Sequence, residues 1–171
     1  MKLLAVSCWL LVVGAAVCGC SSSYSWRSAV PADARTVTVP TFRNESDVSE
    51  VGALASRQLL REFQREGTFK VRTSGEAAIE VQGVIKSVTP AMSAYNRRAG
   101  GRVAAYDLSA TAEISVIDKR TRKVLVDNRK YVANATFTAG QDRTTAVRDA
   151  SGRLMDDLAR QVVDDILNLK W

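Results

Sequence analysis

The stretch VAAYDLSATAEISVID, residues 103–118, decides the fold, because apolar and polar side chains alternate along most of its length. The even positions are apolar: Tyr106, Leu108, Ala110, Ala112, Ile114 and Val116. The odd positions, apart from Val103, Ala105 and Ile117, are polar: Asp107, Ser109, Thr111, Glu113 and Ser115. Successive side chains of a strand point to opposite faces, so this pattern predicts a long antiparallel strand with one buried and one polar face.

Further strands are predicted on both sides of this stretch. Within residues 78–88, Ile79, Val81 and Ile85 alternate with polar residues. Residues 118–122 read as a charged turn, and 123–137 return as another strand with an irregular stretch at 126–128 that predicts a β-bulge. Upstream, residues 35–43 (RTVTVPTFR) predict the first strand, in which Pro40 indicates an edge position or a bulge because it lacks an N–H.

Two segments have the period of an amphipathic helix. In the first, Val51, Leu54, Ala55, Leu59 and Phe63 form one apolar stripe. A capping-box pattern at Asp47 and Glu50 precedes it, and Gly67 ends it. The second covers residues 144–168. The order strand, helix, three strands, helix predicts an α/β two-layer sandwich, with a mixed four-stranded sheet and both helices packed on its apolar face (β-α-β-β-β-α).

The amino terminus has the pattern of a lipoprotein signal peptide. Lys2 precedes an apolar run at 3–17, which is shorter than a membrane-spanning helix needs. The run ends in VCGC at 17–20, which resembles the lipobox of bacterial lipoproteins, whose cysteine is lipidated and becomes the first residue. We therefore expect a signal peptide at 1–19, lipidation at Cys20, a lipidated tether at 20–34 and one domain at 35–171. Cys18 is the rival acceptor, and an ordinary secreted protein is the alternative.

Composition narrows the classes of function. The 171 residues include 24 Lys+Arg, 18 Asp+Glu and no His, and the 46% apolar share is that of one folded domain. Without His the chain lacks the commonest general base and metal ligand, so we predict no enzyme, no metal site and no cofactor. Ser21, in place of the Asp that resembles an inner-membrane retention signal, predicts an outer-membrane anchor facing the periplasm. Nucleic acid is then not an expected partner.

Positive charge is concentrated in one region of the chain. Residues 86–130 hold ten basic and four acidic side chains, a net charge of +6. Arginine and lysine bind phosphate strongly, so an anionic glycolipid is a sensible ligand. The candidate ligand-binding residues are Arg97, Arg98, Arg102, Lys119, Arg120, Arg122 and Lys123. The alternative is that charged hairpin tips only protect solubility and sheet edges.

Several motifs together resemble one family. The lipobox, YSWR at 24–27, VTVPTFRNES at 37–46, LLREF at 59–63, GTFKV at 67–71 and the terminal helix resemble the LptE lipoproteins of lipopolysaccharide assembly. The resemblance implies the two-layer sandwich, a one-to-one partnership with the LptD β-barrel as plug and assembly partner, and help in delivering lipopolysaccharide to the outer leaflet of the outer membrane. The chain has no invariant lipopolysaccharide-binding motif, so the resemblance assigns no ligand residues.

Two alternatives belong to other classes. The motif at 37–46 after a lipobox is also similar to periplasmic lipoproteins that regulate a peptidoglycan synthase or oligomerise in a secretion channel. A glycan-processing enzyme would need two carboxylates that face one cleft, and Glu80 and Glu113 both point to the polar face of the predicted sheet. The Asp pairs of the last helix are interpreted as a solvated face rather than as metal ligands.

Overall fold

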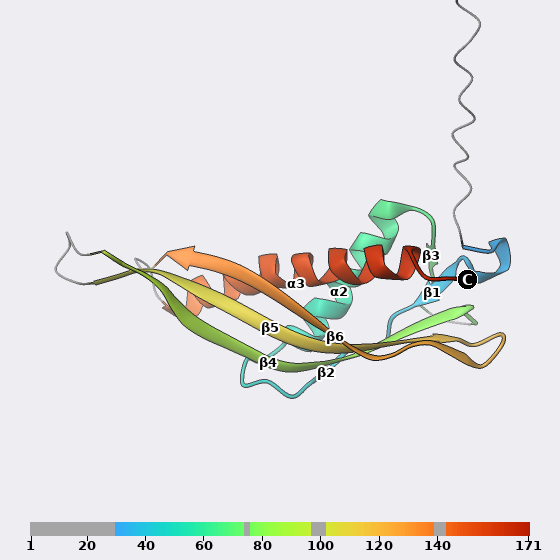
Figure 1. Cartoon of the computed structure of the whole chain (residues 1–171), viewed down its shortest axis with the longest axis horizontal. Helices are drawn as coiled ribbons and strands as arrows, with labels where there is room; N and C mark the ends of the chain where they lie inside the picture. Colours follow the sequence, from blue (N-terminus) through green and yellow to red (C-terminus); the bar gives the residue numbers. More distant parts are fainter. Residues whose placement is uncertain (1–29, 74–75, 97–101, 139–142) are drawn as a thin grey trace, which may run out of the picture.

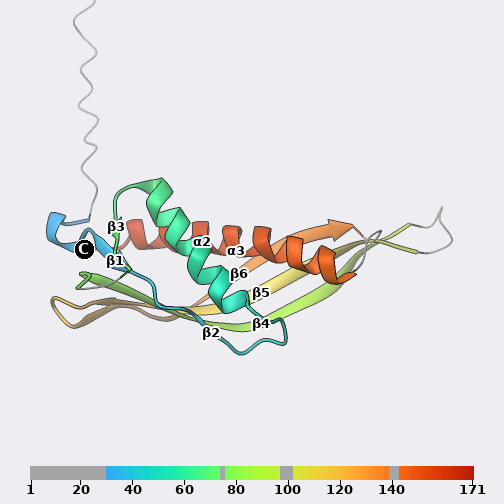
Figure 2. The ribbon, with the colours of Figure 1, turned by 180° about the vertical axis from the view of Figure 1, so that it is seen from behind.

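The computed structural model describes residues 30–73, 76–96, 102–138 and 143–171. Figure 1 shows two layers, a long twisted sheet and a pair of helices on one of its faces. The view from behind in Figure 2 places both helices on the same side of the sheet. The α/β two-layer sandwich predicted from the sequence is therefore confirmed.

Three long strands form the body of the sheet. Strands β4 (Ile79–Asn96), β5 (Arg102–Asp118) and β6 (Lys123–Thr138) pair antiparallel in chain order. Short strands β1 (Thr36–Thr38) and β2 (Arg43–Asn44) pair parallel with β4, and β3 (Lys70–Val71) pairs parallel with β1. The sheet order is β3-β1-β4-β5-β6, with β2 also beside β4.

The predicted four strands are six in the structure. The predicted strand 35–43 is interrupted after Thr38, because the backbone turns toward a helix: the Phe42 N–H donates to Ser56 Oγ at 2.8 Å instead of continuing a ladder. Pro40 lies inside this interruption, and β2 resumes at Arg43. The other added strand is β3, which spans only two residues.

The two helices bury the predicted apolar stripes. Helix α2 (Val51–Glu66) buries Leu59 and Phe63, and helix α3 (Arg143–Leu167) buries Leu154 and Ile166. Gly67 ends α2 as predicted, in the left-handed region at φ 83° with its N–H on the Phe63 carbonyl. The capping-box prediction is wrong. The residue before α2 adopts φ 64° and its side chain makes no cap hydrogen bond.

The buried face of the sheet is the one predicted from residues 103–118. Leu108, Ala110, Ala112, Ile114 and Val116 are buried beneath the helices. The predicted bulge is also present, since the register shifts between Ile114 and Val116. There Asn128 adopts φ 40° and its N–H donates to Ser115 Oγ at 3.0 Å.

The folded domain begins earlier than the sequence suggests. Val30 is 1% exposed and Ala34 is completely buried, although both fall in the expected tether. Ala34 closes the 3-10 helix η1 (Ala32–Ala34), and Arg35 Nε donates to the Val30 carbonyl at 3.2 Å. Residues 30–34 are thus part of the domain, and Cys20 lies outside the described residues.

Candidate functional site

The basic residues singled out in the sequence belong to two ends of the sheet. Asp118 at the end of β5 pairs with Ile79 at the start of β4, whereas Arg102 at the start of β5 pairs with Asn96. At about 3.3 Å per residue, the length of β5 separates these two ends by about 50 Å. Arg97 and Arg98 lie outside the described residues, as does the side chain of Arg102. The described candidates are therefore those of the β5–β6 turn.

Two of the four basic residues in this turn have acidic partners. Lys119 Nζ lies 3.0 Å from Glu80 Oε2. Arg120 Nη2 donates to Asp118 Oδ2 at 2.8 Å, and its other terminal nitrogen pairs with Asp33. Asp118 Oδ1 also accepts the Arg120 N–H at 2.9 Å, which fixes the turn. Arg120 therefore connects the turn to the segment before β1, and its charge is largely compensated.

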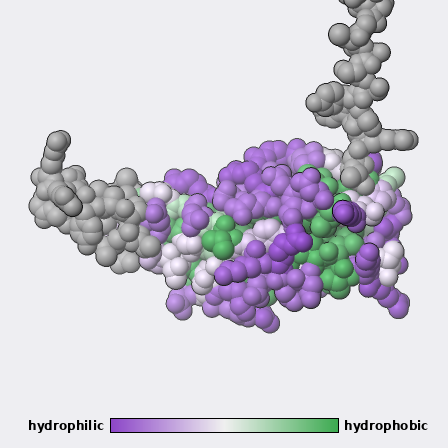
Figure 3. Space-filling view, in the orientation of Figure 1, coloured by the Kyte–Doolittle hydropathy of each residue, from purple (hydrophilic) through white to green (hydrophobic). Residues whose placement is uncertain are grey.

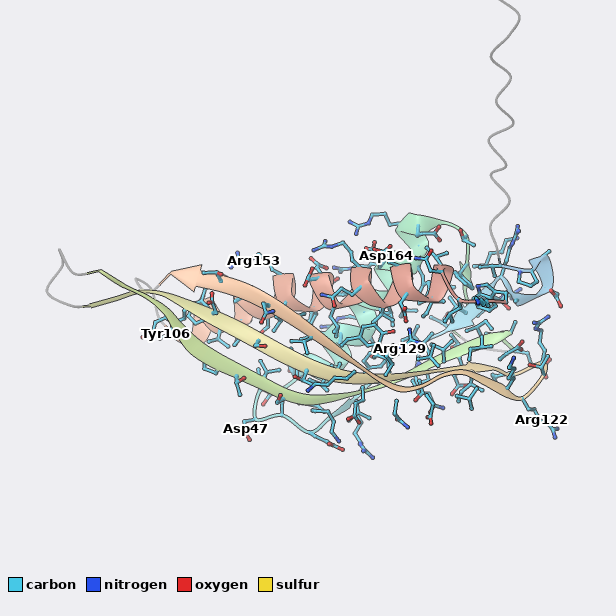
Figure 4. The ribbon with its side chains drawn as sticks, in the orientation of Figure 1. Asp47, Tyr106, Arg122, Arg129, Arg153 and Asp164 are labelled. Carbon is cyan, nitrogen blue, oxygen red and sulfur yellow. The ribbon has the colours of Figure 1, made fainter. Side chains whose placement is uncertain are left out.

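The other two cations of the turn have no ion-pair partner within the part of the chain that the structure describes. Arg122 and Lys123 are exposed, and Arg122 adopts φ 55° at the tip of the turn. Figure 4 shows the Arg122 side chain extending from the end of the sheet, away from both helices. These two residues are available to bind an anion at this end.

Lys70 is a further cation at the same end that sequence reasoning missed. It is exposed and lies opposite Thr36 in the parallel pairing of β3 with β1. In the sheet order, β4 and β5 lie between β1 and β6. Neighbouring strands of a sheet are about 4.8 Å apart. Phe69 and Val71 on either side of Lys70 indicate a short strand, but nothing in the sequence places that strand beside β1 at this end of the sheet.

The polar face of the sheet carries a connected set of ion pairs. Lys86 Nζ lies 2.7 Å from Glu45 Oε2 and 3.8 Å from Glu113 Oε2, and Arg43 pairs with the other oxygen of Glu45. The hydrogen bond with Lys86 lowers the pKa of Glu45, and the same contact raises the pKa of Lys86. These charges on the polar face therefore compensate each other. Figure 3 shows that much of the surface visible in this view is hydrophilic.

Glu80 on the polar face is not suited to act as a general acid. Hydrogen bonds from Gln82 and then Lys119 lower its pKa, whereas the acid of a glycan-processing pair needs a raised pKa. Glu113 is engaged with Lys86 on the same face. Glu80 is therefore a poor proton donor for a glycan-processing enzyme with paired carboxylates.

One of the predicted solvated aspartates holds the two layers together. Asp165 on α3 is half-buried and accepts a 2.5 Å hydrogen bond from the Tyr131 hydroxyl on β6, and it also pairs with Arg129. Burial, followed by the hydrogen bond to Asp165, raises the pKa of Tyr131. Asp165 therefore links α3 to β6 and is not part of an outer solvated face.

An open groove of about 750 Å³ lies between the start of α2 and the first half of α3. Its apolar part includes Val48, Leu54 and Val147, and Arg57 and Arg148 line it with opposite-charged Asp47 and Glu50. The apolar residues and the two arginines could contact an amphiphile that has acyl chains and phosphates, although two carboxylates line the same groove. The lining comes from two segments far apart in the sequence, so no local pattern could predict it.

Among the described residues, no group of three or more Cys, Asp and Glu side chains could hold a metal ion. The helices described here are all too short or too polar to cross a membrane.

Comparisons with known proteins decide the family. The LptE (lipopolysaccharide-assembly) family model matches residues 34–168, nearly the whole domain. The chain belongs to the LptE family. A comparison with curated protein sequences gives no match.

Solved structures of other proteins have a similar fold. The chain is similar to the hypothetical protein CT253 from Chlamydia trachomatis, with 13% identity, 79% of this chain and 96% of that chain covered, and a TM-score of 0.54. It is also similar to a minor lipoprotein from Acinetobacter baumannii, with 14% identity, 78% and 93% covered, and a TM-score of 0.50. At these identities the likeness concerns the fold alone.

Proposed function

We propose that this LptE-family chain is an outer-membrane lipoprotein that plugs and assists assembly of an LptD β-barrel and helps deliver lipopolysaccharide to the outer leaflet. Membership of the lipopolysaccharide-assembly family over residues 34–168 carries this proposal. The role is non-catalytic: the domain binds and presents surface to a one-to-one barrel partner.

The sheet supports a position inside a wide barrel. Its outer face is lined with half-buried polar side chains such as Ser109 and Thr111, and with compensated ion pairs around Lys86. The lumen of a large transmembrane barrel is polar and water-filled. A polar sheet face can contact such a lumen without burying an unpaired charge.

Lipidation at Cys20 would set the orientation of the domain. Val30, which is buried, comes ten positions after Cys20, and a segment of this length spans at most about 35 Å when fully extended. Val30 lies at the end of the sheet that bears the β5–β6 turn, because Asp33 pairs with Arg120. The turn would therefore face the anchoring leaflet, and the far ends of β4 and β5 would point away from it (Figure 1).

The proposed ligand has phosphates and acyl chains, and the domain offers groups for both. Arg122 and Lys123 are exposed cations at the end near the anchor. The groove of α2 and α3 combines apolar Leu54 and Val147 with Arg57 and Arg148.

Site-specific crosslinking tests the barrel partnership. Photo-crosslinkers at Ser109 and Thr111 on the polar face, and at Arg98, should capture an outer-membrane protein of barrel size. Ala110 is the matched control, because it lies between these positions in sequence and is completely buried. Affinity purification from detergent-solubilised membranes should recover the same barrel in one-to-one ratio.

Other crosslinked products would contradict the proposal. Capture of a peptidoglycan synthase alone from Ser109 and Thr111 would assign the chain to the regulatory lipoproteins. Capture of further copies of the chain alone from these face positions would favour an oligomeric secretion channel.

A further inference from the structure

Strand β6 leaves one edge of the sheet open. It is the last strand in the order β3-β1-β4-β5-β6, and within the described ranges no other strand pairs with its outer side. A strand edge presents a row of backbone N–H and C=O groups that can pair with another chain. Figure 1 shows β6 along the outside of the sheet, with α3 running close above it.

The two halves of this edge differ in their protection. The first half holds two register shifts and the left-handed Asn128, followed by the charged Arg129 and Lys130. Bulges and charges of this kind prevent pairing of edge strands. The second half, Tyr131-Val-Ala-Asn-Ala-Thr-Phe137, has seven residues without charge, proline or glycine. Such segments have the composition of self-pairing strands.

A contact from α3 shows which backbone groups of this segment point outward. Arg153 Nη2 donates to the Thr136 carbonyl at 3.1 Å from over the β6 edge (Figure 4). Backbone groups that point to the same side alternate along an antiparallel strand. Val132 and Asn134 therefore also present their N–H and C=O outward, and Val132 is 43% exposed.

We propose that residues 131–137 of β6 form an edge-to-edge antiparallel pair with the same segment of a second copy of this chain. With the twofold axis at Ala133, outward-facing Val132 lies opposite Asn134 of the other copy and Lys130 lies opposite Thr136. The two sheets then form one continuous sheet. This self-association concerns the chain outside the one-to-one barrel complex; it goes beyond the proposed function and does not depend on it.

Like charges stay far apart when this segment pairs with its own copy in this register. In this register the Lys130 side chains of the two copies are six residues apart along the strands, about 20 Å, beyond the Debye length of about 8 Å. A one-residue slip would place inward-pointing groups at the edge and lose the ladder. The uncharged segment can therefore pair with its own copy without placing like charges opposite each other.

Arg153 competes with this pairing. Its guanidinium occupies the Thr136 carbonyl that an N–H of the second copy would otherwise reach. Each backbone hydrogen bond changes an association constant by about fivefold. Loss of Arg153 should therefore strengthen the dimer, whereas loss of an outward N–H should weaken it.

Sedimentation equilibrium of the full-length chain in density-matched detergent measures the association. We expect a concentration-dependent monomer–dimer equilibrium. Asn134→Pro removes an outward N–H from each copy and should weaken dimerisation at least tenfold, since two ladder bonds are lost. Val132→Lys keeps the backbone intact and should weaken it by placing two like charges diagonally across the pair. Arg153→Ala should strengthen it several-fold.

Val124→Lys is the matched control. Val124 is 50% exposed on the same strand but lies on the other side of the bulge, so this change should leave dimerisation unaltered. Circular dichroism checks that each variant is folded. A chain that stays monomeric at all concentrations, or a dimer that both Asn134→Pro and Val132→Lys leave unchanged, would overturn the proposal.

Discussion

The ring of Phe42 lies directly against Gly83 on β4, so closely that a Cβ built on Gly83 would be 2.5 Å from Phe42 Cε2. Phe42 is buried, and its N–H is held by Ser56 on α2. The chain that leaves β1 is thereby fixed between the sheet and the helix. A glycine at position 83 makes this close approach possible.

We expect Gly83→Ala to lower the free energy of unfolding by about 1–3 kcal/mol, the usual cost of an extra methyl group in a packed site. Urea denaturation of the purified chain measures the difference. Gly152→Ala is the control. Gly152 is helical and nothing lies within 4 Å of the position that a Cβ would take, so alanine should stabilise by about 0.5–1 kcal/mol. Equal effects of the two changes would contradict the close approach of Phe42.

The hydrogen bond from Tyr131 to Asp165 gives stability a pH dependence. Because burial and Asp165 raise the pKa of Tyr131 above its usual 10.0, the folded chain keeps the phenol proton longer than the unfolded chain does. The contribution is fully present below about pH 10, the usual tyrosine pKa, and is lost progressively as the pH rises above it. Other groups titrate in this range, so the comparison must be made with a variant.

Tyr131→Phe should reduce the free energy of unfolding by about 1–2 kcal/mol at pH 8, because Asp165 loses a hydrogen-bond donor. Its stability should fall less steeply than that of the unmodified chain between pH 9.5 and pH 11, a range chosen about the usual tyrosine pKa of about 10. Urea denaturation at several pH values measures both slopes. Identical slopes would show that Tyr131 ionises equally in the folded and unfolded chains.

The fold could largely be predicted because its long elements have clear periods. The alternation at Leu108, Ala110 and Ala112 specifies the buried face, and the irregular stretch before Asn128 indicates the bulge. The apolar stripe of α2 from Val51 could be predicted but its cap could not, because side-chain contacts rather than a repeating pattern hold the chain before the helix. Asn44 Nδ2 donates to the Val48 carbonyl at 2.8 Å, and Ser56 holds Phe42. Such contacts leave no repeat in the sequence.

Only part of the candidate site could be predicted from the sequence. Composition identified the basic turn, but Arg120 and Lys119 find their partners in Asp33 and Glu80, which are remote in the chain. Only the tertiary structure shows that these two cations are paired whereas Arg122 is exposed. The groove between α2 and α3 likewise depends on packing of two helices that a long segment separates.

The anchoring prediction concerns Cys20, from its place after an apolar run and Gly19. Cys20→Ala should leave the chain unprocessed or release it from the outer membrane, because the acyl chains that hold it would be missing. Membrane fractionation with a carbonate wash, together with the mass of the mature chain, measures this. A Cys20→Ala chain that still fractionates with the outer membrane without a partner there would contradict lipidation at this residue.

The final prediction separates the free cations of the β5–β6 turn from the paired ones. Replacing Arg122 and Lys123 together with Gln should weaken lipopolysaccharide binding and reduce its salt dependence, because both charges are exposed and their attraction to phosphate is screened within about 8–10 Å. Arg120→Gln is the matched comparison. It should mainly lower the free energy of unfolding by loosening the turn from Asp33 and Asp118, with a smaller effect on binding. Binding to lipopolysaccharide measured at low and high salt, beside urea denaturation, gives both quantities. If Arg120→Gln reduced binding as much as the double change while stability stayed constant, the ion pairs of Arg120 would not determine which cations are available.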